Sequence, residues 1–340
     1  MTETEISHMA KLSYLDLYTT DPAYNLAAEQ YVFDALPRDR MYFMLWQNRN
    51  AIIIGKYQNT LAEINAPFVE EKGIQVVRRL SGGGAVYHDM GNLNFTFIVD
   101  AGNAEELDMH LFCQPVVRTL ETLGVHAEVN GRNDITIDGK KFSGNSQYMR
   151  GGRVMHHGTI MFDSDLSVVG QALHVDVSKI QAKGLKSVRS RVTNVRPYLP
   201  RDIELPEFRR ILLENILLEN PGEAYALTES DRAAIEELRR TRYATWDWNY
   251  GSSPECTLLK RRRIEGVGTV EARIFVEHGR ITAIRFVGDF FSADEPEALA
   301  ARFVGRRPER EEFAAALEGV DASRYFMGIR NAQLIELLSE

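Results

Sequence analysis

The sequence predicts an α+β protein with a large N-terminal domain and a smaller C-terminal domain. Segments with apolar residues at helical spacing occur among strand-like runs of β-branched and aromatic residues. The chain has 340 residues, enough for one large and one small domain. The pattern changes around Gly251-Ser252-Ser253-Pro254, so we expect domains over residues 1–251 and 252–340.

The first clear element is a helix that begins after Asp21 and stops before Pro37. Asp21 is a suitable N-cap, and Pro22 suits a first helical turn. By the same spacing argument, further helices are expected over residues 61–72, 104–123, 207–219, 229–241, 295–304 and 308–318. Strands are expected over residues 41–46, 51–55, 74–80 and 92–99, in a strand-rich region over 127–162, and as two or three antiparallel strands over 256–290. Residues 92–99 alternate polar and apolar side chains, which predicts a half-buried strand.

The pair Asp138-Gly139 predicts a two-residue hairpin turn. Such a turn sets Thr136 opposite Lys141, Ile135 opposite Phe142, and Asp134 opposite Ser143. Side-chain alternation then forms one polar face, made of Asp134, Thr136, Lys141, Ser143 and Asn145. The other face is apolar and should pack against the core; it holds Ile135, Ile137 and Phe142. A solvated outer face is the alternative, but the small residues Gly144-Asn145-Ser146 favour close approach of a ligand.

The most informative segment is the glycine-rich loop Ser81-Gly82-Gly83-Gly84, which lies between two strand-like runs. Its N–H groups can converge on an anion, and Arg78, Arg79 and His88 lie beside it. The loop has neither the Walker nor the Rossmann pattern. A surface turn is the alternative, which the flanking arginines and histidine make less favourable.

Four other side chains are candidates for a chemical role, each with a structural alternative. Asp134 could help to bind Mg²⁺ or orient a lysine, or it could belong to an ordinary turn. His156 and His157 are adjacent on a strand, so at most one should reach a given site, and no zinc-ligand cluster completes them. Cys113 lies among apolar residues and is expected to be a buried thiol rather than a nucleophile.

Composition narrows the class of protein. The formal charge of −8 argues against a nucleic-acid-binding protein. The two cysteines, Cys113 and Cys256, have no metal-site spacing and fit a reducing compartment. We expect no membrane span, no signal peptide and therefore a cytoplasmic protein. The run Trp246–Tyr250 is expected to pack one domain against the other.

Several motifs in one order resemble a known family. They are the segments 21–27, 54–59 and 78–92, followed by Gly131-Arg132-Asn133-Asp134, Lys141-Phe142-Ser143-Gly144, His156-His157-Gly158-Thr159 and residues 186–194. Together they resemble the lipoate–protein ligases in their long form, with a C-terminal accessory domain. Where that family often has Ser-Gly-Ser-Ala, this chain has Ser143-Gly144-Asn145-Ser146.

The resemblance implies a biotin/lipoate-ligase-like fold, related to the class II synthetase core, with a mixed sheet plus helices. It also implies an enzyme that converts lipoate and ATP, with Mg²⁺, to lipoyl-AMP and pyrophosphate. The lipoyl group then passes to a lysine of an acceptor protein. The implied acceptors are E2 lipoyl domains of 2-oxoacid dehydrogenases and the glycine-cleavage H protein, with no nucleic acid or membrane as partner.

The resemblance also implies site residues, with Lys141 as the catalytic residue that contacts both the acyl carbonyl and the α-phosphate. The expected ATP contacts are Arg79, Gly82, Gly83, Gly84, Ala85, Val86, Tyr87, Asn133, Asp134 and Lys141. The expected lipoate contacts are Arg79, Gly83, His88, Lys141, Ser143 and His157. Val77, Val86 and Phe95 are candidates for the apolar tunnel, and Asp134 is a weak candidate for a Mg²⁺ ligand.

Three alternatives remain. An octanoyl or lipoyl transferase of the same fold would work without ATP, and those that form thioesters need a cysteine in the site. A biotin ligase would have a Gly-Arg-Gly-Arg type loop, which is missing. A non-catalytic lipoate- or nucleotide-binding regulator would not need Lys141, Arg79 and the whole loop.

Overall fold

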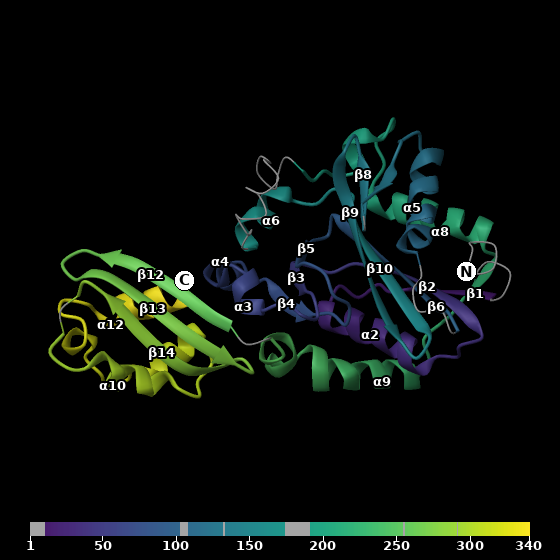
Figure 1. Cartoon of the computed structure of the whole chain (residues 1–340). Helices are drawn as coiled ribbons and strands as arrows, with labels where there is room; N and C mark the ends of the chain where they lie inside the picture. The colour runs from purple at the N-terminus through teal and green to yellow at the C-terminus, as the bar shows by residue number, and fades with distance from the viewer. Residues whose placement is uncertain (1–10, 103–107, 132, 174–190, 254–255, 291) are drawn as a thin grey trace. The chain divides into compact units, whose positions relative to one another are not determined.

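The computed structural model describes residues 11–102, 108–131, 133–173, 191–253, 256–290 and 292–340. These residues form two units (Figure 1). The first unit takes in residues 11–56, 74–171 and 191–244 of the described ranges, and the second takes in 57–73, 172–173 and 245–340. The domain boundary near residue 252 stays a prediction.

The first unit is built on an eight-stranded mixed sheet with the order β11-β1-β2-β6-β10-β9-β8-β7. The strands β11, β1 and β2 run parallel to one another, and each later neighbour is antiparallel. Their bounds are β1 (Lys11–Asp16), β2 (Arg40–Trp46), β6 (Asn92–Asp100), β7 (Glu128–Asn130), β8 (Asp134–Ile137), β9 (Lys140–Arg150), β10 (Arg153–Met161) and β11 (Gly222–Ala224). Neither β1 nor β11 was among the expected strands.

A smaller sheet of the same unit carries the glycine-rich loop. It consists of β3 (Ala51–Ile54) between the parallel β4 (Gln75–Arg78) and the antiparallel β5 (Val86–His88). Residues 79–85 connect β4 to β5, so the expected loop between two strands is confirmed. The expected strands at 41–46 and 51–55 also form, but they belong to different sheets.

Helices cover both faces of the large sheet. The core on one face includes side chains of α5 (Met109–Thr122) and α8 (Leu205–Glu219). On the other face lies α2 (Pro22–Ala35), which packs on β6 and β10 and against α9 (Glu229–Leu238). Strand β6 was expected to be half-buried; that prediction is wrong, because eight of its nine residues are buried between these helix layers.

Side-chain caps explain where several helices begin. The Asp21 carboxylate caps α2 by accepting the N–H of Ala23 at 2.9 Å, as expected. The single helix expected over residues 61–72 is wrong: Asn65 caps a second short helix, which divides the segment into α3 (Thr60–Glu63) and α4 (Ala66–Glu71). The remaining helical segments in and beside this unit are α6 (Leu166–Ala172), the 3₁₀ turn η2 (Arg196–Tyr198) and the π turn η3 (Arg239–Tyr243).

The hairpin between β8 and β9 forms at the expected turn, with positive φ angles of 50° at Asp138 and 71° at Gly139. Thr136 lies opposite Lys141 as expected. A bulge then shifts the register, so that Ile135 pairs with Ser143 and Asp134 with Gly144. The two pairings expected beyond Thr136 are therefore wrong, because one extra residue of β9 is accommodated there. The apolar face is confirmed, since Ile135, Ile137 and Phe142 all belong to the core.

The second unit has the expected antiparallel sheet, with β12 (Cys256–Ile264), β13 (Gly268–Glu277) and β14 (Arg280–Gly288). His278-Gly279 forms the turn between β13 and β14. One apolar cluster joins this sheet to its helices, which are α10 (Pro296–Ala300), η5 (Ala301–Phe303), α11 (Arg310–Ala316), η6 (Ala322–Arg324) and the unexpected α12 (Asn331–Ser339). Trp246, next to the π turn η4 (Asp247–Gly251), stacks on Tyr250 within this unit.

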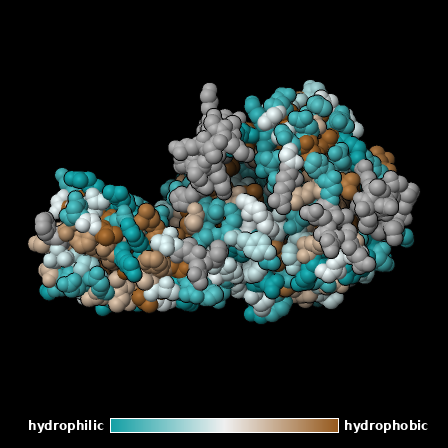
Figure 2. All heavy atoms as spheres, viewed as in Figure 1, coloured by the Kyte–Doolittle hydropathy of each residue, from teal (hydrophilic) through white to brown (hydrophobic). Residues whose placement is uncertain are grey.

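The surface is mixed in character. Hydrophobic residues on the visible face of each unit are scattered among hydrophilic ones (Figure 2). None of the described helices has the length and apolar composition that a membrane crossing requires.

Candidate active site

The first unit contains a cavity of about 130 Å³, lined by the glycine-rich loop, strands β2, β3, β5, β6, β9 and β10, and helix α2. Polar and apolar side chains share its wall. The lining residues are Leu26, Trp46, Ile53, Arg79, Gly83, Gly84, Ala85, Val86, His88, Asn94, Asn133, Lys141, Gly144, Asn145, Ser146, His157, Gly158 and Thr159. Such a mixture of an apolar wall and a few convergent polar groups is typical of a small-molecule site.

Lys141 brings a positive charge to the cavity wall. Its Nζ lies 2.7 Å from Oδ1 of Asp134, and the two side chains are 34% and 37% exposed. The expected pairing of Asp134 with a lysine is therefore present. The ammonium lies close to Gly144, where a Cβ atom would come within 2.9 Å of Nζ. Gly144 therefore leaves room for the lysine head group.

The glycine-rich loop turns its carbonyl groups towards Arg79. That guanidinium is buried and donates to the carbonyl oxygens of Gly82 at 2.7 Å and Gly84 at 2.9 Å, and to the carbonyl oxygen of Ile53 at 3.1 Å. Burial lowers the pKa of Arg79 to about 10, an effect that Glu29 opposes. The group stays charged at neutral pH.

The N–H groups of the loop have no acceptor in the described part of the chain. No N–H of residues 82–85 donates a hydrogen bond to another part of the described chain. Gly83 has a φ of 95°, which favours glycine, and both Gly83 and Gly84 are exposed. Successive free N–H groups of this kind form a concave anion-binding surface.

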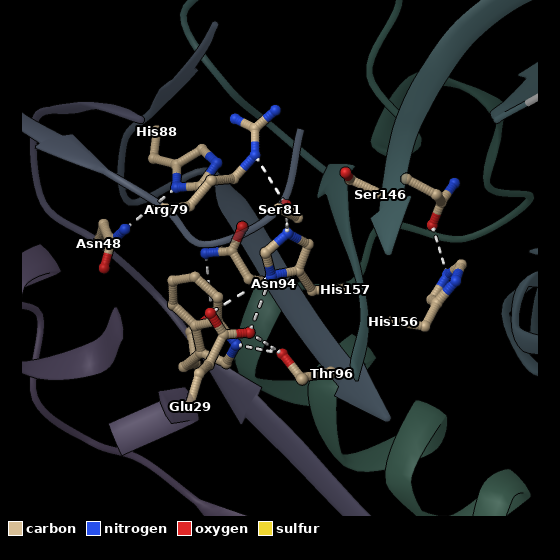
Figure 3. Close-up of polar contacts among 12 residues, drawn as sticks. Glu29, Asn48, Arg79, Ser81, His88, Asn94, Thr96, Ser146, His156 and His157 are labelled. Carbon is tan, nitrogen blue, oxygen red and sulfur yellow. Dashed lines mark hydrogen bonds and ion pairs between the residues drawn. The ribbon is translucent and has the colours of Figure 1, made fainter. Parts of the chain in front are cut away.

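A chain of buried polar groups connects the loop to α2 (Figure 3). The Nε of Arg79 donates to Ser81 Oγ at 3.1 Å, and Ser81 Oγ lies 2.6 Å from His157 Nε2. His157 Nδ1 lies 3.1 Å from Oε1 of Glu29. Glu29 also accepts the hydroxyl of Thr96 at 2.5 Å.

His88 is a neutral donor at the cavity wall. Asn48 Nδ2 donates to His88 Nδ1 at 3.1 Å, which places the ring proton on Nε2. That Nε2 is buried and has no partner among the described residues. Burial lowers the pKa of His88 to about 3, with smaller contributions from Arg79 and His157.

The two adjacent histidines of β10 separate as expected. His157 lines the cavity, whereas His156 lies in the core, with its ring stacked on Phe95 and Phe112. Its Nε2 lies 3.2 Å from Oδ1 of Asn145, which orients that amide at the cavity wall.

Nine of the expected ligand contacts line the cavity: Arg79, Gly83, Gly84, Ala85, Val86, His88, Asn133, Lys141 and His157. The other four are adjacent to it rather than in its wall. Gly82 accepts bonds through its carbonyl, Tyr87 donates to Asn50 at 3.1 Å, Asp134 pairs with Lys141, and Ser143 is fully buried. Of the tunnel candidates, Val86 lines the cavity, whereas Val77 and Phe95 do not. The ligand roles of all these residues stay predictions.

The sequence interpretation missed Glu29, Trp46 and Ser146. Trp46 lines the cavity and donates to Thr96 at 2.9 Å, and Ser146 Oγ donates to the carbonyl of Gly82 at 2.8 Å. For Glu29 a signal was present, because it lies three residues after Leu26 and four before Phe33 on the buried side of α2. A charged residue at such a position needs a partner.

A Mg²⁺ ion that enters with ATP would find few protein ligands here. Across the described ranges, no group of three or more His, Cys, Asp or Glu side chains gathers in a way that could hold a metal ion. Asp134, with Asn133 beside it at the cavity, provides one carboxylate. This fits the usual mode of Mg²⁺ binding, in which one or two carboxylates and the substrate phosphates supply the ligands.

Comparisons with known proteins agree on one family. The model of the lipoyl protein ligase A/B catalytic domain matches residues 21–217, and that of the bacterial lipoate protein ligase C-terminus matches residues 253–338. The lipoate-protein ligase LplJ of Bacillus subtilis is 44% identical over 94% of this chain and 97% of its own length. Lipoate–protein ligase 1 of Staphylococcus aureus is 42% identical over 94% of this chain and 97% of its own length.

Several solved structures have a similar fold, and three of them cover 71–72% of this chain. Lipoate-protein ligase A bound with ATP superposes with a TM-score of 0.59 and 25% identity, over 72% of this chain and 99% of its own. A Thermoplasma acidophilum protein solved with bound lipoic acid has a TM-score of 0.60 and 25% identity, over 71% of this chain and 99% of its own. A bipartite lipoate protein ligase from the same organism, studied with its E2 lipoyl domain, has a TM-score of 0.62 and 27% identity, over 72% and 97%. The expected fold class is confirmed, and the chain belongs to the lipoate–protein ligase family.

Proposed function

We propose that this ATP-dependent lipoate–protein ligase carries out both half-reactions at the cavity of the first unit. Lipoate and ATP give lipoyl-AMP and pyrophosphate, and the lipoyl group then passes to a lysine of an acceptor protein. The observation that carries this assignment is the pairing of a lysine ammonium with an anion-binding loop. Lys141 and residues 83–85, whose N–H groups have no acceptor among the described residues, line one cavity.

Lys141 is the catalytic residue of the proposal. When the carboxylate of lipoate attacks the α-phosphate, two anionic groups must come together. An ammonium between them offsets their repulsion as charge builds in the transition state. A compact lysine charge can serve oxygens in different planes, which a planar guanidinium serves less well. The partner Asp134 is partly exposed, so the ammonium can exchange the carboxylate for substrate oxygens.

The glycine-rich loop would hold the phosphates of ATP by its backbone N–H groups. Arg79 supports this by fixing the carbonyls of Gly82 and Gly84, and its positive charge lies at the same wall. Holding the phosphates in line with the attacking carboxylate is a positioning effect, which can lower a barrier substantially. Mg²⁺, when bound with ATP, would neutralise phosphate charge; Asp134 is the residue that could contact it.

The apolar part of the cavity wall would bind the acyl chain. Leu26, Trp46, Ile53 and Val86 supply this surface. His88 adds one buried donor, Nε2–H, which has no partner among the described residues and could meet a polar or sulfur atom of the ligand. The solved ligases of similar fold with bound lipoic acid and with bound ATP support a shared site for the two substrates.

The acceptors would be lipoyl domains, among them those of 2-oxoacid dehydrogenase E2 subunits, and the glycine-cleavage H protein. The archaeal ligase of similar fold that was studied with its E2 lipoyl domain supports this class of partner. A cytoplasmic location remains a prediction.

A thioester-forming transferase is the less favourable alternative. None of the described residues that line the cavity is a cysteine. Cys113 is fully buried in the core, and burial raises the pKa of its thiol to about 12, so it is not a nucleophile at neutral pH.

The test is to incubate the protein with lipoate, MgATP and an apo lipoyl domain, and to measure the intact mass of the domain. We expect one lipoyl group to be added, only when ATP is present. A mass shift from an acylated donor protein without ATP would favour the transferase, and binding of lipoate or ATP without any mass shift or ATP–pyrophosphate exchange would favour a regulator.

A further inference from the structure

Glu29 is a buried carboxylate that does not line the cavity. It lies on α2 with 2% of its surface exposed and is absent from the described residues of the cavity wall. A carboxylate in such a place is costly unless it is hydrogen-bonded and its charge is compensated. Its partners are the Thr96 hydroxyl at 2.5 Å and His157 Nδ1 at 3.1 Å. Thr96 and His157 are opposite each other on β6 and β10 and face α2 together.

The position of each proton in this hydrogen-bonded network follows from the groups at its two ends, which can only donate. The indole N–H of Trp46 can only donate, so Thr96 Oγ1 accepts it and turns its own proton to Glu29. At the other end, the Nε–H of Arg79 donates to Ser81 Oγ at 3.1 Å and to the Gly82 carbonyl at 3.3 Å. His157 Nε2, 2.6 Å from Ser81 Oγ, is the one acceptor that the described residues offer to the Ser81 proton.

His157 must therefore carry its proton on Nδ1, facing Glu29. The Glu29 carboxylate then accepts from both Thr96 and His157 (Figure 3). The network has the Glu29 carboxylate at one end and the Arg79 cation at the other. The two charges compensate each other in a buried region.

We propose that Glu29 is a positioning residue for the glycine-rich loop. It orients His157, which holds Ser81 at the start of the loop. On the opposite side Ser146 holds the Gly82 carbonyl at 2.8 Å. Held from both sides, the loop keeps its carbonyls inward and its N–H groups of residues 82–85 available to the anionic ligand.

Replacement of Glu29 by Gln gives a clear expectation. Glutamine removes the charge of Glu29 and puts an amide NH2 in place of Oε2, which lies 3.3 Å from His157 Nδ1. This amide donor favours an acceptor at Nδ1, so His157 should move its proton to Nε2. Ser81 would then lose the acceptor of its own proton, and Arg79 would lose its compensating charge. The loop should then hold its N–H groups less well in position to bind ATP. The apolar wall that binds the acyl chain should be unchanged.

The first test reads the tautomer directly, with ¹⁵N-labelled histidine in the full chain and the signal of His157 assigned by His157→Asn. We expect Nδ1–H in the wild-type protein and Nε2–H in Glu29→Gln. A wild-type His157 protonated on Nε2 overturns the proposal. This test does not depend on any enzymatic activity.

The second test measures KM and kcat in lipoate-dependent ATP–pyrophosphate exchange, and it rests on the proposed function. Glu29→Gln should raise KM for ATP at least tenfold and leave KM for lipoate within about twofold. The matched control is Arg153→Lys, because Arg153 donates to the carbonyls of Phe33 and Leu36 at the other end of α2. This control should lower the melting temperature without changing either KM.

An unchanged KM for ATP in folded Glu29→Gln, or an equal rise in the control, would show that the network only stabilises the fold. A wild-type protein with no exchange activity would refute the proposed function instead. In that case ATP binding by calorimetry replaces the KM comparison, with the same two variants and the same tenfold criterion.

Discussion

The charge of Lys141 is the feature whose removal should matter most for the chemistry and least for the fold. An ammonium about 4 Å from an anionic oxygen, at an effective dielectric constant of about 20, contributes about 4 kcal/mol. This corresponds to about three orders of magnitude in rate. Removal of a single preorganised donor in other enzymes costs about 2.7–4 kcal/mol, which is the same scale. We therefore expect Lys141→Ala to lower kcat/KM for lipoyl-adenylate formation by about a thousandfold.

The effect on stability should be small. The Lys141–Asp134 pair is more than a third exposed on average, with fractions of 34% and 37%, so water screens it. Such pairs contribute about 0–1 kcal/mol, which is a shift of at most about 4 °C in melting temperature. Adenylate formation is measured by ATP–pyrophosphate exchange, and the fold by circular dichroism melting.

The neighbouring Lys140→Ala is the matched control, because Lys140 is exposed and does not line the cavity. It should keep nearly full activity. The reasoning about Lys141 is refuted if Lys141→Ala keeps its activity within tenfold of wild type, or if Lys140→Ala loses as much. A folded Lys141→Arg variant should also lose most of its activity, since a planar fork cannot serve the same oxygens.

Three further predictions address the surroundings of this site. Gly144→Ala places a Cβ 2.9 Å from Lys141 Nζ and should lower exchange activity at least tenfold with little loss of stability. The control Gly170→Ala, with open space around the added Cβ, should be neutral. Equal activities of the two variants would contradict the placement of the ammonium. Cys113 should resist alkylation by iodoacetamide at pH 8 in the native protein and react after unfolding, because burial raises its pKa to about 12. Peptide mass mapping measures the alkylation, and rapid labelling of the native protein would show an accessible thiol. His88 and His156 have pKa values lowered to about 3 by burial, so the unfolded chain binds protons between pH 6.5 and 3 that the folded chain does not, and stability falls as the pH drops through that window. Each histidine contributes about 1.4 kcal/mol per pH unit, so one pH unit below 6.5 the loss is about 3 kcal/mol; an unchanged urea midpoint between pH 7 and 5.5 would rule this out.

Local signals predicted many elements because their causes are local. Asp21 before Pro22 marks a helix start wherever that segment folds, and Asp138-Gly139 adopts the positive φ angles of a tight turn. Alternation around that turn identified both the apolar face and the polar side with Lys141.

The predicted strand register and burial were wrong where a distant part of the chain determines the local structure. The bulge between β8 and β9 shifted the expected pairs, because a register can change by one residue without any sign in the alternating pattern. Strand β6 appeared half-buried because its polar residues alternate with apolar ones, whereas α2 covers the polar side as well.

The sequence by itself determined the family, the glycine-rich loop between two strands and the lysine that bears the catalytic proposal, because these depend on residue type and short-range spacing. Only the tertiary structure decided what each charge meets. It directs Arg79 to the carbonyls of the loop, pairs Lys141 with Asp134, and joins Glu29 on α2 to a histidine 128 positions later in the chain. The physical reason is that a buried or partly buried charge takes its partner from whichever strand or helix packs against it, and sequence spacing carries no record of that contact.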